Sequence, residues 1–135
     1  MIDDVVADTH AVLWYTLEPE QLSSIATEKL DKAVSQGGRI FISAISLVEI
    51  VYLEEKRRIA VGTGKLLTDI ISLPNSAIEV VSVDAAIAGR LAGIPRAAVP
   101  DMPDRIIAAT ALHLNLPLVT RDNRIQALAT IQTIW

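Results

Sequence analysis

Carboxylates are the side chains best placed for chemistry in this chain. Asp101 and Asp104 stand three residues apart at the start of an apolar helical run, while Asp8, Glu49 and Asp122 flank other apolar segments. Carboxylates without cysteine or histidine partners select hard cations, so Mg²⁺ or Mn²⁺ is the expected metal. Such a site can orient a phosphate group and lower the pKa of a bound water molecule. A fold that gathers Asp8, Glu49, Asp104 and Asp122 would therefore form a cation site.

Most of these acids also have a structural interpretation as helix caps. Pro103 suits a first helical turn because it has no backbone N–H to leave unpaired. Asp101 is then the expected N-cap residue, and Asp104 falls in the first turn, where a carboxylate meets free N–H groups. Asp8 could start the turn after its strand, and Asp122 could cap a following helix. Each acid alone is therefore a weak signal.

Glu49 is the most informative of the acids. At helical spacing its neighbours are Ile45, Ser46, Tyr52 and Leu53, so it borders an apolar stripe rather than the charged end of its helix. No lysine or arginine lies at helical spacing from it, and a partly buried carboxylate without a partner is costly. This position favours a role in a site.

Strand and helix patterns alternate along the chain. Strands are predicted for residues 5–8, 39–43, 78–83, 118–120 and 131–135. Helices are predicted for residues 24–34, 44–58, 65–73, 84–91, about 101–115 and 125–129, and residues 9–14 form a loop or a first helix. This alternation predicts one domain over residues 1–135, a three-layer α/β/α sandwich with a mainly parallel central sheet of about five strands. Ligands bind such sheets at the carboxyl ends of the strands, where the acids fall.

Composition narrows the functional classes. The chain has 135 residues, 51% of them hydrophobic and only 4% aromatic, with no cysteine and a net charge of −4. Disulfides, thiolate nucleophiles and cysteine-bound zinc are excluded. The longest apolar stretch, residues 45–53, is interrupted by Glu49 and too short to span a bilayer. We expect no targeting segment, a cytoplasmic location and, from the apolar content, a dimer contact.

Five segments together resemble the PIN-domain ribonucleases, specifically the VapC-type toxins of toxin–antitoxin pairs. They are ADTHA at residues 7–11, SAISLVEI at 43–50, PDRIIAATA at 103–111, LVTRD at 118–122 and the closing IQTIW at 131–135. The resemblance spans nearly the whole chain. It implies a PIN-like fold and a Mg²⁺- or Mn²⁺-dependent endoribonuclease.

The resemblance also assigns roles to individual residues. Asp8, Glu49 and Asp104 match the central metal-binding acids of the family, and Asp122 matches its more variable fourth acid. Thr120 matches a small hydroxyl residue that often assists at the site.

Asp101 aligns with a further acid that is less consistently assigned to the metal. The family pattern is commonly Asp-Pro-x-Asp, whereas here Pro103 immediately precedes Asp104. This shift leaves the assisting role of Asp101 open.

The resemblance implies macromolecular partners as well. They are an RNA substrate such as tRNA or rRNA, a cognate antitoxin whose tail enters the site, and a second copy of the chain. The basic run Lys56, Arg57 and Arg58 is either a contact for RNA phosphates or the antitoxin, or a solvated helix end.

Two alternative functions stay open from the sequence. One is a non-catalytic PIN-like binding module in which the acids serve only as caps. The other is a phosphatase of the haloacid-dehalogenase type, which also uses an aspartate after its first strand. That class needs a second aspartate two residues after Asp8, where this chain has His10.

Overall fold

The computed structural model describes residues 3–135 and has a five-stranded sheet at its centre. The strand order is β3-β2-β1-β4-β5, and every neighbouring pair is parallel. The strands are β1 (Val5–Ala7), β2 (Ile40–Ser43), β3 (Ile78–Val81), β4 (Leu118–Val119) and β5 (Thr133–Ile134). The predicted parallel sheet of about five strands is confirmed.

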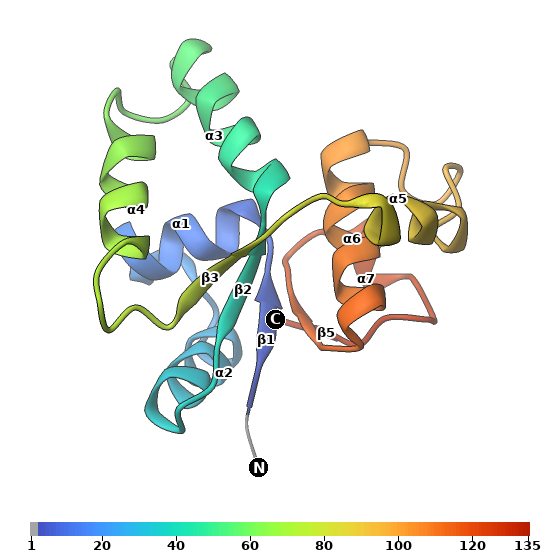
Figure 1. Ribbon diagram of the computed structural model, residues 1–135, viewed down its shortest axis with the longest axis horizontal. Coiled ribbons are helices and arrows are strands. Elements are labelled where there is room, and N and C mark those ends of the chain that lie inside the picture. Colours follow the sequence, from blue (N-terminus) through green and yellow to red (C-terminus); the bar gives the residue numbers. More distant parts are fainter. Residues whose placement is uncertain (1–2) are drawn as a thin grey trace.

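Helices cover both faces of this sheet, giving the predicted three layers (Figure 1). The α-helices are α1 (Thr9–Leu17), α2 (Ser24–Ser35), α3 (Ala44–Glu55), α4 (Thr63–Ile71), α5 (Ala85–Arg90), α6 (Met102–Leu114) and α7 (Asn123–Gln126). Two short 3₁₀ turns, η1 (Pro19–Gln21) and η2 (Leu91–Gly93), were not predicted. In the described residues, no helix has the length and apolar character needed to cross a membrane.

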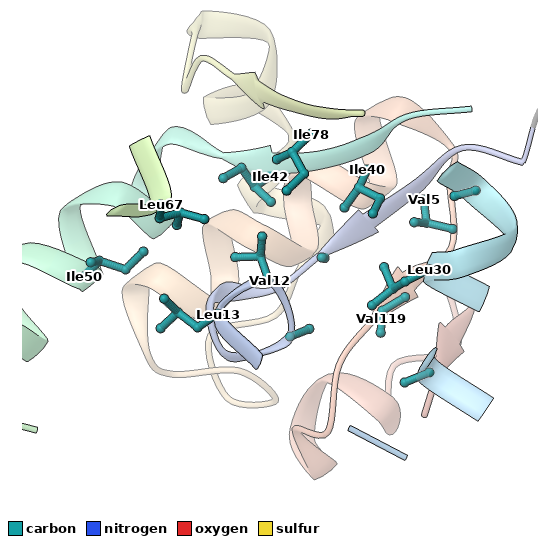
Figure 2. Packing of buried hydrophobic residues seen from close by; sticks show 14 residues of the cluster. Val5, Val12, Leu13, Leu30, Ile40, Ile42, Ile50, Leu67, Ile78 and Val119 are labelled. Atoms are coloured by element: carbon teal, nitrogen blue, oxygen red, sulfur yellow. The ribbon is translucent and has the colours of Figure 1, made fainter. Parts of the chain in front are cut away.

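The core has two halves, one on each face of the sheet. Successive side chains of a strand point to opposite faces, so Val5 and Ala7 pack with α1 to α4 while Val6 packs with α5 to α7. Figure 2 shows the first half, where Leu30 and Val12 reach the strands. Because both faces are covered, β1 is wholly apolar and fully buried.

The carboxyl edge of the sheet collects the chain segments that carry the acids. β1 lies between β2 and β4, and all three run in the same direction. Asp8 follows β1 directly, α3 with Glu49 follows β2, and Thr120 follows β4. Since the connections after β1 lead to β2 on one side and later to β4 on the other, this edge is also the switch point of the topology.

α3 ends three residues earlier than the predicted 44–58. Arg57 adopts the left-handed conformation, with φ 56°. The N–H of Arg58 then donates to the carbonyl of Leu53 and the N–H of Arg57 to that of Glu54, which is a Schellman motif formed without glycine. Lys56, Arg57 and Arg58 are exposed beyond the helix.

Two strands are shorter than predicted by two residues or more because their partners end, and the other three are each shorter by one residue. The sequence pattern extends β3 to residue 83, but its last pair is Val81 with Ser43, where β2 turns into α3. β5 covers two residues of the predicted 131–135, since β4 offers only Leu118 and Val119 for pairing. The lengths of β3 and β5 are therefore set by the strands with which they pair.

The two ends of α6 agree with the prediction. Asp101 is the N-cap residue, and its carboxylate accepts a hydrogen bond of 3.1 Å from the backbone N–H of Asp104. Asn115, with φ 55°, ends the helix just before Leu116 and Pro117. The segment 125–129, by contrast, was predicted too late, since Asp122 caps a helix that begins at Asn123.

Arg105 ties the segment before α6 to the helix itself. Its Nε donates to the carbonyl of Ile94 at 2.7 Å, and its Nη2 donates to that of Leu91 at 3.0 Å. Ile94 is fully buried. These bonds fix the chain that leads into Asp101, and hence the start of α6.

We expect Arg105→Met to loosen this segment and to lower the free energy of unfolding by about 1–3 kcal/mol. The substitution removes two hydrogen bonds and leaves the Ile94 carbonyl without a donor, while the Leu91 carbonyl still accepts from the backbone N–H of Ile94. Hydrogen exchange followed by mass spectrometry should show faster exchange in peptides from residues 85–100. The control is Arg90→Met, an exposed position in the last turn of α5. Equal exchange in the two variants would contradict this role of Arg105.

Candidate active site

The acids chosen from the sequence line one pocket. Its volume is about 320 Å³, and it lies at the carboxyl edge of the sheet. Its walls are formed by Asp8, Thr9, His10, Trp14, Glu49, Asp101, Asp104, Arg121 and Asp122. The fold thus brings together five carboxylates from four separate segments of the chain.

Three of these carboxylates are also helix N-caps. Asp8 accepts from the N–H of Ala11 at 2.8 Å at the start of α1. Asp122 accepts from the N–H groups of Arg124 at 2.8 Å and Ile125 at 3.0 Å at the start of α7. With Asp101 on α6, each cap occupies one carboxylate oxygen with backbone donors and fixes the acid at the pocket wall. Capping and pocket formation are therefore compatible.

Glu49 is held by hydroxyl groups instead. The Thr9 hydroxyl lies 2.6 Å from its Oε1 and 2.8 Å from the Ser46 hydroxyl. The Thr9 hydroxyl has one proton, so when it donates to the carboxylate it accepts from Ser46. Thr9 and Ser46 are both buried. Sequence reasoning did not assign either residue, although Thr9 follows Asp8 and Ser46 lies one helical turn before Glu49.

Thr120 lies behind the pocket rather than in its wall. It is fully buried, and its hydroxyl accepts from the backbone N–H of Asp122 at 3.0 Å. A hydrogen bond with Thr120 also lowers the pKa of Asp8, partly offsetting the larger rise that burial causes. Thr120 thus connects two of the acids, Asp8 and Asp122.

Asp104 has the least support of the acids. Within residues 3–135 its carboxylate has neither a hydrogen-bond donor nor a cationic partner. Burial, and then the charges of Asp101, Asp122, Glu49 and Asp8, raise its pKa to about 7. Burial likewise raises the pKa of Glu49, and the hydrogen bond with Thr9 offsets part of that rise. The pocket therefore contains more negative charge than its own side chains neutralise.

The donor chemistry of the pocket, five carboxylates without cysteine, suits a hard cation. In the described part of the chain, no group of three or more acidic or histidine side chains is arranged closely enough to hold a metal ion. The five carboxylates instead line a pocket of about 320 Å³. Mg²⁺ commonly keeps several waters and binds through only one or two carboxylates, so the donor set fits this ion or Mn²⁺.

Fold and pocket together define a class of small α/β domains with an acidic pocket at the carboxyl edge of a parallel sheet. The family model described as PIN domain matches residues 5–131. The chain belongs to the PIN domain family.

Individual relatives agree with this assignment. The chain is 28% identical over 123 residues to Ribonuclease VapC22 of Mycobacterium tuberculosis, which covers 91% of this chain and 90% of that protein. Its fold is similar to that in a VapBC2 structure from Rickettsia felis bound to a promoter DNA fragment, with a TM-score of 0.71, 18% identity and 96% of each chain covered. It is also similar to FitAcB from Neisseria gonorrhoeae, with a TM-score of 0.64, 24% identity and 96% and 95% coverage.

A third solved structure extends the comparison. It is a toxin–antitoxin complex from Klebsiella pneumoniae, with a TM-score of 0.63, 20% identity and 94% of each chain covered. These likenesses confirm the PIN-like fold predicted from the sequence. They give no support to the haloacid-dehalogenase alternative.

We expect Asp104→Asn to stabilise the metal-free protein at pH 8. A carboxyl whose pKa is about 7 when folded and near 3.8 when unfolded binds more proton in the folded state, so its contribution to stability falls as pH rises from about 4 to 7. Asparagine does not ionise, so the variant avoids this loss. Its free energy of unfolding should exceed that of the wild type by on the order of 1–2 kcal/mol at pH 8, after allowance for solvent screening.

Thermal unfolding in EDTA from pH 4.5 to pH 8 measures this difference. Asp69→Asn is the matched control, because Asp69 is exposed and paired with Lys65 at 2.9 Å. If Asp104→Asn is no more stable than wild type at pH 8, then burial and the neighbouring acids do not destabilise the ionised Asp104 carboxylate significantly.

Proposed function

We propose that this chain is a metal-dependent endoribonuclease and the toxin of a toxin–antitoxin pair. The observation that carries the proposal is the pocket of a PIN domain that Asp8, Glu49 and Asp104 line, where none of the three is in an ion pair with any residue from 3 to 135. The relative named as a ribonuclease supports the reaction class. RNA phosphodiester hydrolysis needs no cysteine or serine nucleophile, which agrees with a pocket built from carboxylates.

Asp8, Glu49, Asp104 and Asp122 are the proposed ligands of Mg²⁺ or Mn²⁺. A bound ion of this kind activates water and offsets the charge of a phosphate group. Burial and hydroxyl bonds at Asp8 and Glu49 hold these carboxylates in place before any ion binds. Asp104 would release a proton on binding at neutral pH, since its pKa is raised to about 7.

Asp101 and Thr120 are assigned assisting roles. Asp101 is exposed and its carboxylate caps the backbone of Asp104, so it positions the start of α6 at the pocket. Thr120 holds the backbone of Asp122 and contacts Asp8 from behind. Both act on the metal-binding acids rather than in their place.

The proposed partners are RNA, an antitoxin and a second copy of the chain, with tRNA or rRNA as the RNA class and the cytoplasm as the location. Two of the structural neighbours are described as VapBC2 and as a toxin–antitoxin complex, which supports an antitoxin partner. Val48, Val51 and Tyr52 on α3 are each about half exposed, at 49%, 52% and 57%. This apolar surface supports a protein contact.

A non-catalytic binding module is the second candidate, because three of the acids already have a structural use as caps. Caps alone would bind no divalent ion tightly. Binding of Mn²⁺ therefore separates the two candidates.

We expect Mn²⁺ to raise the melting temperature of the wild-type protein and to have much less effect on Asp104→Asn. Ion at a hundred times its dissociation constant stabilises the folded state by about 2.7 kcal/mol. Thermal unfolding with Mn²⁺ and with EDTA measures the shift, and Asp69→Asn should respond like wild type. Equal shifts in wild type and Asp104→Asn would place the ion elsewhere.

We expect purified protein freed of any partner to cut labelled tRNA or rRNA with Mg²⁺ or Mn²⁺ and not with EDTA. Asp8→Asn and Asp104→Asn should each reduce the rate about a thousandfold, because a lost metal ligand removes several kcal/mol of transition-state stabilisation. Gel analysis of the products measures the rate. Cutting that persists unchanged in both variants would indicate a contaminating nuclease and defeat the proposal.

A further inference from the structure

The pocket also has a wall of a different chemistry, formed by His10, Trp14 and Arg121. The Cζ atom of Arg121 lies 4.6 Å from the centroid of the Trp14 ring, in the range of a cation–π contact. Arg121 is the one lysine or arginine among the described residues that line this pocket. The function of the acids does not explain this stacked pair.

Trp14 has a fixed position. Its ring centroid lies 5.9 Å from that of Trp135 in an edge-to-face arrangement and 5.3 Å from that of His10. Trp135 packs in turn against the core of the first sheet face. Trp14 also belongs to α1, the helix that Asp8 caps. One rigid helix therefore sets both a proposed metal ligand and the aromatic surface beneath the guanidinium.

Arg121 is not the counter-ion of the acids around it. In the part of the chain that the structure describes, its guanidinium is in no ion pair within 4.0 Å and donates no hydrogen bond. This holds although Asp122 is its neighbour in sequence and five carboxylates share its pocket. Stacking on Trp14 leaves the N–H groups at the edge of the exposed guanidinium free.

A free, planar cation beside an acidic pocket fits an anion that bridges both. Arginine presents paired N–H donors that match phosphate oxygens. We propose that Arg121 binds a backbone phosphate of the RNA at this pocket, and that Trp14 is the residue that positions it. This assignment rests on the proposed ribonuclease function and adds the residue that engages the substrate from the protein side.

The test is steady-state cleavage of a labelled single-stranded RNA with Mn²⁺, by wild type and by Arg121→Gln, over a series of salt concentrations. The matched control is Arg124→Gln. Arg124 is exposed and three residues away, and it does not line the pocket, so the control makes the same change in net charge. Melting temperatures of all variants report any loss of structure.

We expect Arg121→Gln to lower kcat/KM about tenfold, mainly through KM, since one charge-assisted phosphate contact is lost. The slope of log kcat/KM against log salt should become shallower by about 0.7, the value for one phosphate contact on a single strand. Arg124→Gln should change neither quantity by as much as twofold. A residue with a structural role alone would lower the melting temperature and leave the salt slope unchanged.

The role of Trp14 has a separate test. Trp14→Leu should reproduce the loss seen in Arg121→Gln, and the double variant should be no worse, because Trp14 acts through Arg121. Trp14→Phe keeps an aromatic face and should retain most of the activity. Additive losses in the double variant would show that Trp14 acts independently of Arg121.

The outcomes separate this inference from the proposed function. If the wild type cuts RNA and Arg121→Gln behaves like Arg124→Gln, the phosphate assignment fails and the ribonuclease stands. If the wild type cuts no RNA and Mn²⁺ does not raise its melting temperature, the proposed function fails, and the assignment of Arg121 fails with it.

Discussion

The structure depends on keeping several carboxylates close together in a partly buried space. Burial and mutual repulsion both oppose ionisation, and Asp104, which has no donor of its own among the described residues, shows the effect most strongly with a pKa raised to about 7. Backbone N–H groups at the starts of α1, α6 and α7 and the Thr9 hydroxyl hold the other acids. These neutral donors keep the acids in position without cancelling their charge.

The parallel sheet makes this arrangement possible. In the order β3-β2-β1-β4-β5 the short central strand β1 is completely buried, and Asp8, which follows it directly, lies at the carboxyl edge. The crossovers return the chain to the same edge each time, and acids more than a hundred residues apart meet there. Arg105 fixes the one acidic segment, at the start of α6, that no strand precedes directly.

The sequence was sufficient for the fold class, for most elements and for placing the acids at one edge of the sheet, because these follow from apolar periodicity and local capping chemistry. It was insufficient for features that depend on a neighbouring strand or on the conformation of a single residue. β3 ends at Val81 because β2 ends, and α3 ends at Glu55 because Arg57 adopts a conformation that few non-glycine residues do. The Thr9–Glu49 bond and the Arg121–Trp14 stack join residues 40 and about 107 positions apart, so no local pattern reveals them.

The same acid can be both a helix cap and a metal ligand. A carboxylate has two oxygens, and an N-cap bond uses one of them on the backbone while the other can face the pocket. Capping stabilises the helix whether or not an ion is bound, so the fold by itself holds Asp8, Asp101 and Asp122 at the wall of the pocket. On the proposed function, ion binding then need not supply the folding energy of the domain, in contrast to small zinc domains that unfold without metal. On that proposal, the energy of ion binding is left for relieving the repulsion around Asp104 and for binding the phosphate.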